Sequence, residues 1–234
     1  MIQVLKLPAY RRLLAAYTLN ELALYFGSLA LAVLVYRRTG SAVGAMAFFL
    51  CAQFVPALFS PLLVARIDQR SARAVLPCLY LLEAVAFGAL AWVTKHFAVA
   101  PVLALTLLDG IIALTARAIA RAATVAVTAP VGLLRDGNVL TNALFSVCFM
   151  AGPALAGVVV VAGGISDVLL INSVLFVLIA VTVATTRGLP QSLQEQAPTA
   201  GRLRAALTHA RESPAIRTLL SVQAVALLFF TISI

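Results

Sequence analysis

Long apolar runs, separated by short polar connectors, make up most of this chain. A helix that crosses a bilayer needs about 20 predominantly apolar residues, and six runs are close to that length or longer. They lie at about Leu13–Tyr36, Val43–Ala65, Val75–Thr94, Val99–Ala120, Leu140–Ala162 and Val168–Thr185. The pattern predicts six transmembrane helices. It also predicts polar turns at Arg135–Asn138 and Gly163–Asp167, and an N-cap for the second helix at Ser41.

A long polar segment and a seventh apolar run follow the sixth span. Residues 188–201 contain two prolines and several glutamines, which is typical of a flexible linker. Residues 202–212 place leucines and alanines on one helical face, which predicts a short helix on the membrane surface, with a merely solvated helix as the alternative. The last run, 218–234, is at the lower limit for spanning a bilayer. We expect a six-helix bundle over 1–186, a cytoplasmic linker over 187–217, and the truncated start of a seventh helix that packs little against the bundle.

The composition excludes an ordinary soluble enzyme. Of 234 residues, 63% are hydrophobic and 11% are charged, and the mean hydropathy is +1.06, whereas a soluble domain carries about 25% charged residues. The three cysteines stand alone inside apolar runs, without the spacing of a metal site or a disulfide framework. Because no metalloprotease, hydrolase or phosphate-binding motif occurs, we expect no enzymatic activity, no metal and no cofactor.

The positive charge indicates orientation rather than nucleic-acid binding. The net charge of +9 arises from 17 Lys and Arg against 8 Asp and Glu, and the cations lie between the spans. Cytoplasmic loops of membrane proteins are enriched in Lys and Arg. A cytoplasmic N-terminus would place three cations, Arg37, Arg38 and Lys95, outside and the other fourteen inside. We therefore expect an integral membrane protein with a cytoplasmic N-terminus, the lipid bilayer as a partner, and no nucleic acid.

Polar residues inside the first span point to a solute pathway. Glu21 lies midway along it, and Tyr17, Tyr25 and Ser28 fall on the same helical face. Charged groups inside a membrane usually face a cavity or a partner because exposure to lipid is costly. The stripe suits a water-accessible path for an amphipathic solute, with Glu21 as proton carrier. The alternative is a glutamate that neighbouring helices satisfy for purely structural reasons.

The fourth span carries a second polar arc. It comprises Thr106, Gly110, Arg117, Arg121, Thr124 and Thr128, with Asp109 at its edge. Arg117 is positioned to pair with a carboxylate and to line a cavity. Alternatively, both arginines extend to the cytoplasmic surface. Glu83 in the third span has no evident partner in the sequence, and both a functional and a structural role remain open.

The fifth span contains the hexapeptide Gly152-Pro153-Ala154-Leu155-Ala156-Gly157. The small residues at 152 and 156 allow a neighbouring helix to approach closely, and the proline bends the helix. This hexapeptide resembles the end of the antiporter motif of the major facilitator superfamily, with simple helix packing as the alternative interpretation. Leu63–Arg73 resembles the family's motif in the loop between helices two and three. Further segments resemble the enterobactin-exporter-like and macrolide-efflux-like branch of that family: Thr39–Ala42, Pro56, Pro61, Pro130, Asn142, Ile171–Phe176 and Thr208–Arg217.

The resemblance implies a fold, a location and roles for particular residues. It implies the N-terminal six-helix half of the major facilitator fold, in the bacterial inner membrane. Asp68, Arg70 and Arg73 would belong to the cytoplasmic loop motif, although Val64 and Gln69 depart from its usual residues. Since the family uses two six-helix halves, we expect that the C-terminal half is missing, the chain being either a gene fragment or part of a longer protein.

Together these features predict a fragment of a secondary active transporter. We expect a proton-coupled exporter of small amphipathic molecules, with the proton as coupling ion and Glu21 as its first candidate site. The alternatives are a non-transporting half-size scaffold, a relic that binds a partner bundle, or an importer of the same fold.

Overall fold

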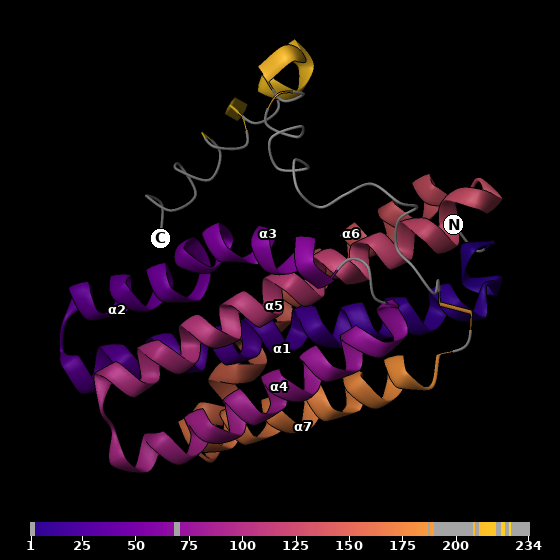
Figure 1. Ribbon diagram of the computed structural model, residues 1–234. Helices are drawn as coiled ribbons and strands as arrows, with labels where there is room; N and C mark the ends of the chain where they lie inside the picture. The colour runs from indigo at the N-terminus through magenta and orange to yellow at the C-terminus, as the bar shows by residue number, and fades with distance from the viewer. Residues whose placement is uncertain are drawn as a thin grey trace. The chain divides into compact units, whose positions relative to one another are not determined.

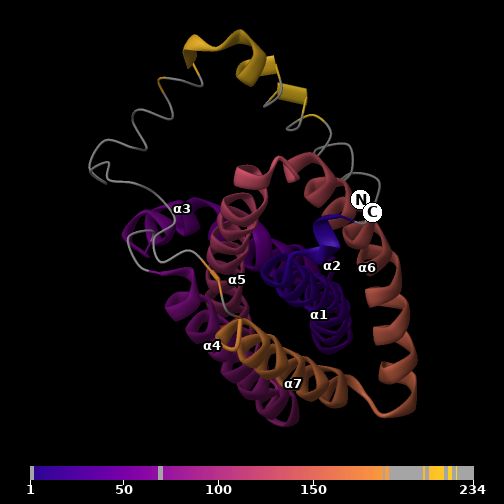
Figure 2. The same cartoon turned by 90° about the vertical axis from the view of Figure 1, so that its right-hand side faces the viewer.

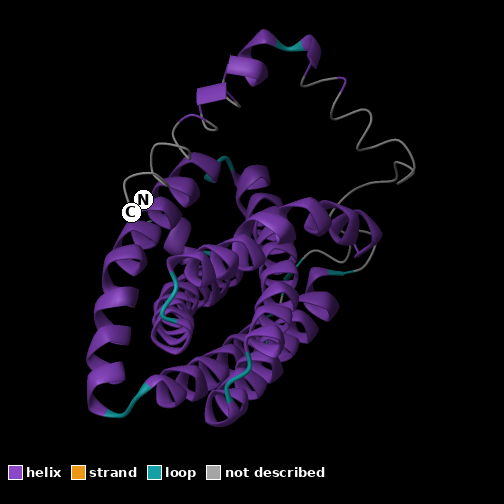
Figure 3. Cartoon of the chain, turned by 90° about the vertical axis from the view of Figure 1, so that its left-hand side faces the viewer, coloured by secondary structure: helices purple, strands orange, loops and turns teal. Residues whose placement is uncertain are grey.

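A computed structural model of the protein describes residues 3–67, 71–186, 188–189, 208, 211–218, 221–222 and 225. The described residues are predominantly helical and include no strand (Figure 3). The chain divides into two compact units, Met1–Gln194 and Glu195–Ile234. Of the second unit, the described residues include the helical stretch 214–218, where the Thr218 hydroxyl donates to the Pro214 carbonyl at 3.0 Å.

Six helical segments in the described part of the chain are long and apolar enough to cross a membrane. Five of them are the single helices α1 (Pro8–Thr39), α4 (Ala72–Val93), α5 (Val99–Thr128), α6 (Leu134–Ala162) and α7 (Ile165–Ala184). The other is a composite of α2 (Ala42–Phe49), a π turn (Leu50–Phe54) and α3 (Val55–Ile67). This architecture, an all-α integral membrane protein, confirms the six predicted spans.

Helix α1 lies in the middle of the first unit, and the other spans surround it (Figures 1 and 2). It packs against α6 on one side and α7 on another, while α4 packs extensively along α7 and also against α5. The composite second span lies against α5. Because α1 has neighbours on several sides, residues on more than one of its faces are buried, Glu21 among them.

The π turn in the second span has a direct cause in the sequence. Pro56 lacks an N–H, so the carbonyl of Ala52 cannot receive the usual bond from the residue four positions later. At the turn the Val55 N–H donates to Leu50, five residues back. Helix α5 approaches this point closely: a β carbon on Gly110 would lie 2.5 Å from the Ala52 oxygen. Only glycine fits at that position without displacing the second span.

Small residues also bring α6 against α1. A β carbon on Gly152 would lie 2.6 Å from the Tyr25 β carbon, and Ala156, one turn later, is fully buried. By contrast, a β carbon on Gly157 would meet nothing within 4 Å. The predicted close packing at positions 152 and 156 is therefore present, and Gly157 takes no part in it.

Short connections join the described helices, and some of the helix ends are capped. Gly40 ends α1 in the left-handed conformation, at φ 60°, and its N–H donates to the Tyr36 carbonyl. Ser71 caps α4 by accepting a hydrogen bond from the Ala74 N–H at 3.3 Å. Ser41 occupies the predicted N-cap position of α2, but its side chain makes no capping hydrogen bond.

Two predicted turns differ from the structure, and one apolar run ends before its helix does. The polar stretch Arg135–Asn138 is not a turn, because it forms the first part of α6. At Gly163–Asp167 only the two glycines form the connection, and α7 already begins at Ile165. Helix α5 continues eight residues beyond Ala120, the end of its apolar run, to Thr128. Polar residues at helix ends were mistaken for loops, since helical hydrogen bonding continues after the apolar run stops.

The predicted linker, surface helix and seventh span lie largely outside the described residues. The same applies to Asp68 and Arg70 of the loop motif.

Candidate functional site

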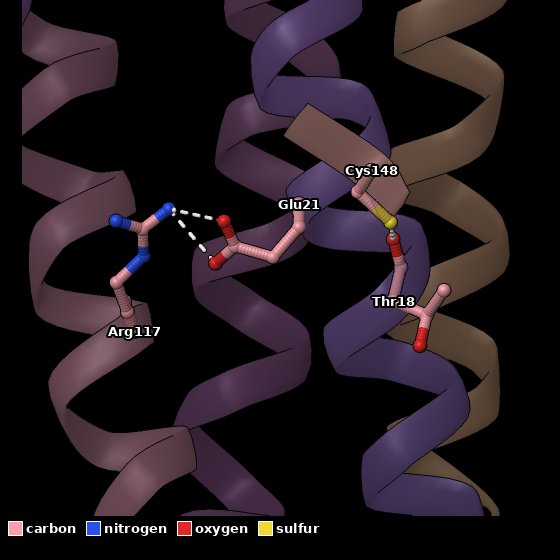
Figure 4. Close-up of polar contacts among 4 residues, drawn as sticks. All are labelled: Thr18, Glu21, Arg117 and Cys148. Carbon is pink, nitrogen blue, oxygen red and sulfur yellow. Dashed lines mark hydrogen bonds and ion pairs between the residues drawn. The ribbon is translucent and has the colours of Figure 1, made fainter. Parts of the chain in front are cut away.

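A buried ion pair joins α1 to α5 near the middle of the bundle. Arg117 Nη2 lies 2.8 Å from Glu21 Oε1 and donates a hydrogen bond of 3.0 Å to Oε2 (Figure 4). The Glu21 side chain is fully buried, and that of Arg117 is 24% exposed. The two residues are 96 positions apart in the sequence. Of the two roles predicted for Arg117, the structure therefore has the first: Arg117 pairs with a carboxylate, and that carboxylate is Glu21.

Neighbouring groups extend this polar centre. Tyr17 lies one turn before Glu21 on α1 and is buried, and Arg121 lies one turn after Arg117, beside Tyr17. Arg121 also acts electrostatically on Glu21, although its own side chain is exposed. On the α6 side, the Cys148 thiol donates to the Thr18 carbonyl at 3.4 Å (Figure 4). Glu21 therefore lies on a helix that faces the arginines of α5 on one side and packs against α6 on the other.

A cavity of about 240 Å³ adjoins the ion pair. It lies among α1, the second span, α4, α5 and α7. Polar and charged side chains form part of its wall: Asn20, Tyr25, Ser28, Gln53, Glu83, Thr106, Asp109 and Arg117. The rest of the wall is apolar and includes the aromatic rings of Phe48, Phe87 and Phe176. Such a mixture of apolar surface and a few polar groups is typical of small-molecule sites.

Several polar atoms near this cavity have no hydrogen-bond partner. Both carboxylate oxygens of Glu83 are buried without one, as are Asp109 Oδ1 and Thr106 Oγ1. Glu83 and Asp109 lie on adjacent helices and are close enough to interact electrostatically. Buried polar groups normally have partners, so the three residues Glu83, Asp109 and Thr106 of the cavity lining carry unsatisfied hydrogen-bonding atoms.

The predicted stripe on α1 divides into two parts. Tyr25 and Ser28 line the cavity, whereas Tyr17 and Glu21 do not. Glu21 contacts the cavity indirectly, through Arg117, which is part of the wall. The polar face of α1 thus serves the ion pair at one end and the cavity at the other.

The predicted arc on α5 also divides. Thr106, Asp109, Gly110 and Arg117 line the cavity. Further along, the hydroxyls of Thr124 and Thr128 donate to carbonyls of their own helix at 2.9 and 2.8 Å. These two threonines are therefore satisfied locally and contribute nothing to the site.

The remaining predicted site residues lie elsewhere. Gly152 packs against α1, and Pro153 lies inside α6. A β carbon on Gly157 would have no neighbouring atom within 4 Å. Arg73 is exposed in the first turn of α4.

Other polar residues of the wall were missed as site residues. Asn20 and Gln53 both interrupt apolar runs, which was a usable signal. Asn172 of α7 is not part of the wall, but it is fully buried with its amide unpartnered, and Gly27 leaves space for it. The aromatic residues Phe48 and Phe87 could not be distinguished from ordinary core residues in an apolar sequence.

Comparisons of this chain with protein-family models, curated proteins and solved structures give no match. Within the described residues, no group of three or more His, Cys, Asp or Glu side chains is arranged to hold a metal ion.

Proposed function

We propose that this chain is the N-terminal half of a secondary transporter of the major facilitator type, which exports small amphipathic molecules in exchange for protons. The observation that carries the proposal is the Glu21–Arg117 ion pair between α1 and α5, beside a partly polar cavity. The resemblance of the Gly152–Gly157 hexapeptide to the antiporter motif supports the same function.

The ion pair provides a means of coupling proton binding to helix movement. A buried pair holds its two helices together as long as both partners are charged. Protonation of Glu21 would remove its negative charge and leave Arg117 without a counter-ion. Arg117 could then turn towards the cavity that it already lines, so that α1 and α5 would be free to separate. Proton uptake would thus alter the wall of the solute site.

Close packing elsewhere defines the parts that would move. Gly152 allows α6 to pack closely against α1, and Gly110 allows α5 to pack closely against the second span. The pairs α1–α6 and α5–second span would each move as one body about the Glu21–Arg117 contact. Alternating access is usually a rigid-body rocking of one repeat against the other, and this smaller movement within one half would accompany it.

Dye transport in inverted membrane vesicles tests this function. The transporter that contains this chain is expressed, a pH gradient is imposed, and uptake of two amphipathic dyes, the cation ethidium and the uncharged Nile red, is followed by fluorescence. We expect gradient-driven uptake of at least one dye, and its loss in Glu21→Gln. The matched control is Glu212→Gln, an exposed glutamate outside the first unit, which should transport normally.

Two results would contradict the proposal. Unchanged uptake in Glu21→Gln would remove Glu21 from the mechanism. Uptake of both dyes no greater than in vesicles without the protein would favour a non-transporting membrane scaffold.

A further inference from the structure

We propose that the cavity binds an amphipathic organic cation, whose positive charge pairs with Glu83 and Asp109 and whose apolar part lies against Phe48, Phe87 and Tyr25. As a statement about the exported solute, this inference rests on the proposed function. As a statement about binding, it depends only on the cavity.

The two carboxyl groups are positioned for a ligand rather than for the fold. Glu83 is fully buried, lines the cavity, and has neither carboxylate oxygen hydrogen-bonded. Asp109 lines the same cavity from the adjacent helix, with Oδ1 buried and unpartnered. A buried carboxylate that serves the fold is expected to have donors or a counter-ion. Here both acids belong to the cavity lining and have buried oxygens without a hydrogen-bond partner.

The charges around the cavity favour a cation. Of the described residues that line it, only Arg117 is positively charged, and Glu21 engages its guanidinium from behind the wall. Arg117 also acts electrostatically on Glu83, but its ion pair is with Glu21, so one cation is shared among the three acids Glu21, Glu83 and Asp109. Ionised, Glu83 and Asp109 would repel each other, and a cation between them would remove that repulsion and supply the missing partner.

The rest of the wall suits an organic cation rather than a metal ion. Phe48, Phe87 and Tyr25 provide aromatic surface next to the acids, and aromatic rings attract cations over their faces. A calcium ion requires six to eight oxygen ligands and magnesium an octahedral set, and among the described residues no group of three or more His, Cys, Asp or Glu side chains is arranged to hold a metal ion. The cavity, at about 240 Å³, is smaller than the pockets of roughly 300–1,000 Å³ that enclose drug-sized ligands. A compact cation with one aromatic ring is therefore the appropriate probe.

Equilibrium binding of benzyltrimethylammonium to the purified 234-residue chain in nanodiscs tests the inference. Its charge is permanent, and neopentylbenzene is an uncharged molecule of the same shape. We expect saturable binding of the cation by calorimetry and much weaker binding of the uncharged analogue. Glu83→Gln and Asp109→Asn should each reduce cation affinity at least about tenfold, while the matched exposed controls Glu212→Gln and Asp167→Asn should bind like the wild type.

Folding and transport are kept separate from binding. Size-exclusion elution and helical circular dichroism identify any variant that fails to fold, and Thr106→Val then serves as a second, uncharged change on the same wall. It should weaken binding by a smaller factor than either acid. Equal affinity for the cation and its uncharged analogue, or unchanged affinity in folded Glu83→Gln and Asp109→Asn, would overturn the inference. Competition by sodium ions alone would replace the organic cation with an inorganic one. In the vesicle assay, dye uptake that an excess of benzyltrimethylammonium does not inhibit would overturn the cation as exported solute and leave the proposed function standing.

Discussion

The Tyr10 hydroxyl donates a buried hydrogen bond of 2.9 Å to the carbonyl of Gly137, 127 residues further along the chain. Tyr10 lies in the first turn of α1 and Gly137 in the first turn of α6. The bond therefore ties together the starts of two helices that also pack closely at Gly152. It also helps explain why α6 begins in a polar stretch: the early residues of α6 have a packing partner there.

Removal of this hydroxyl should destabilise the bundle without changing its fold. We expect Tyr10→Phe to lower the free energy of unfolding by about 0.5–1.5 kcal/mol, the net value of one hydrogen bond, because the Gly137 carbonyl still accepts a bond of 2.9 Å from the Thr141 hydroxyl. Unfolding by sodium dodecyl sulfate in bicelles measures the change. Tyr36→Phe, at an exposed tyrosine, is the control and should have no effect; equal losses in both would assign the effect to something other than this bond.

The ion pair should behave as a unit. In Arg117→Leu, Glu21 would stay buried without its partner, and we expect a loss of about 3–5 kcal/mol in the free energy of unfolding. The double variant Glu21→Leu/Arg117→Leu should recover most of that loss, because no charge is left unpaired. The same unfolding measurement checks both. A double variant as unstable as Arg117→Leu would show that packing, not charge, dominates at Arg117.

Close approach of α5 to the second span makes Gly110 sensitive to substitution. Gly110→Ala would place a β carbon 2.5 Å from the backbone oxygen of Ala52, and we expect a loss of about 1–3 kcal/mol from overpacking. Gly88→Ala is the matched control, since its β carbon would be 3.6 Å from the nearest atom, Ser173 Oγ. Thermal unfolding midpoints compare the two. A tolerated Gly110→Ala would mean that the second span can move away from α5 at little cost.

The hexapeptide in α6 contains its own comparison. Gly152→Ala would force α6 away from Tyr25 on α1, whereas Gly157→Ala would add a β carbon in open space. We expect Gly152→Ala to lower the unfolding midpoint and Gly157→Ala to leave it unchanged or raise it slightly, because alanine favours helix over glycine. Equal effects of the two substitutions on the unfolding midpoint would show that the close contact at Gly152 does not determine stability.

The sequence predicted the spans well because a bilayer imposes one length and one polarity on every crossing. It placed Glu21, Tyr25, Asp109 and Arg117 in polar stripes from helical periodicity alone. The partnership of Glu21 with Arg117 was open, because periodicity gives a face but not the neighbour that the face meets. Glu83 was undecided for the same reason: its relation to Asp109 depends on how α4 and α5 are packed.

The apolar composition also limited which site residues could be predicted from the sequence. Phe48 and Phe87 line the cavity, but in a chain with 63% hydrophobic residues nothing marks them. Helix ends were misplaced where polar residues continue a helix, as at Arg135–Asn138. There the stabilising contacts come from other helices, which hydropathy does not record.

The π turn at Leu50–Phe54 changes which residues of the second span share a face. Phe48 and Pro56 are both buried, yet residues eight apart in an unbroken α-helix point about 80° apart. The π turn acts as one inserted residue, which reduces that difference to about 20°. The second span therefore contains one residue more than an unbroken α-helix with Phe48 and Pro56 on the same face would need. A chain lacking one of the five π-turn positions would keep Phe48 and Pro56 aligned, whereas a deletion elsewhere in a span would rotate the remainder of that helix by about 100°.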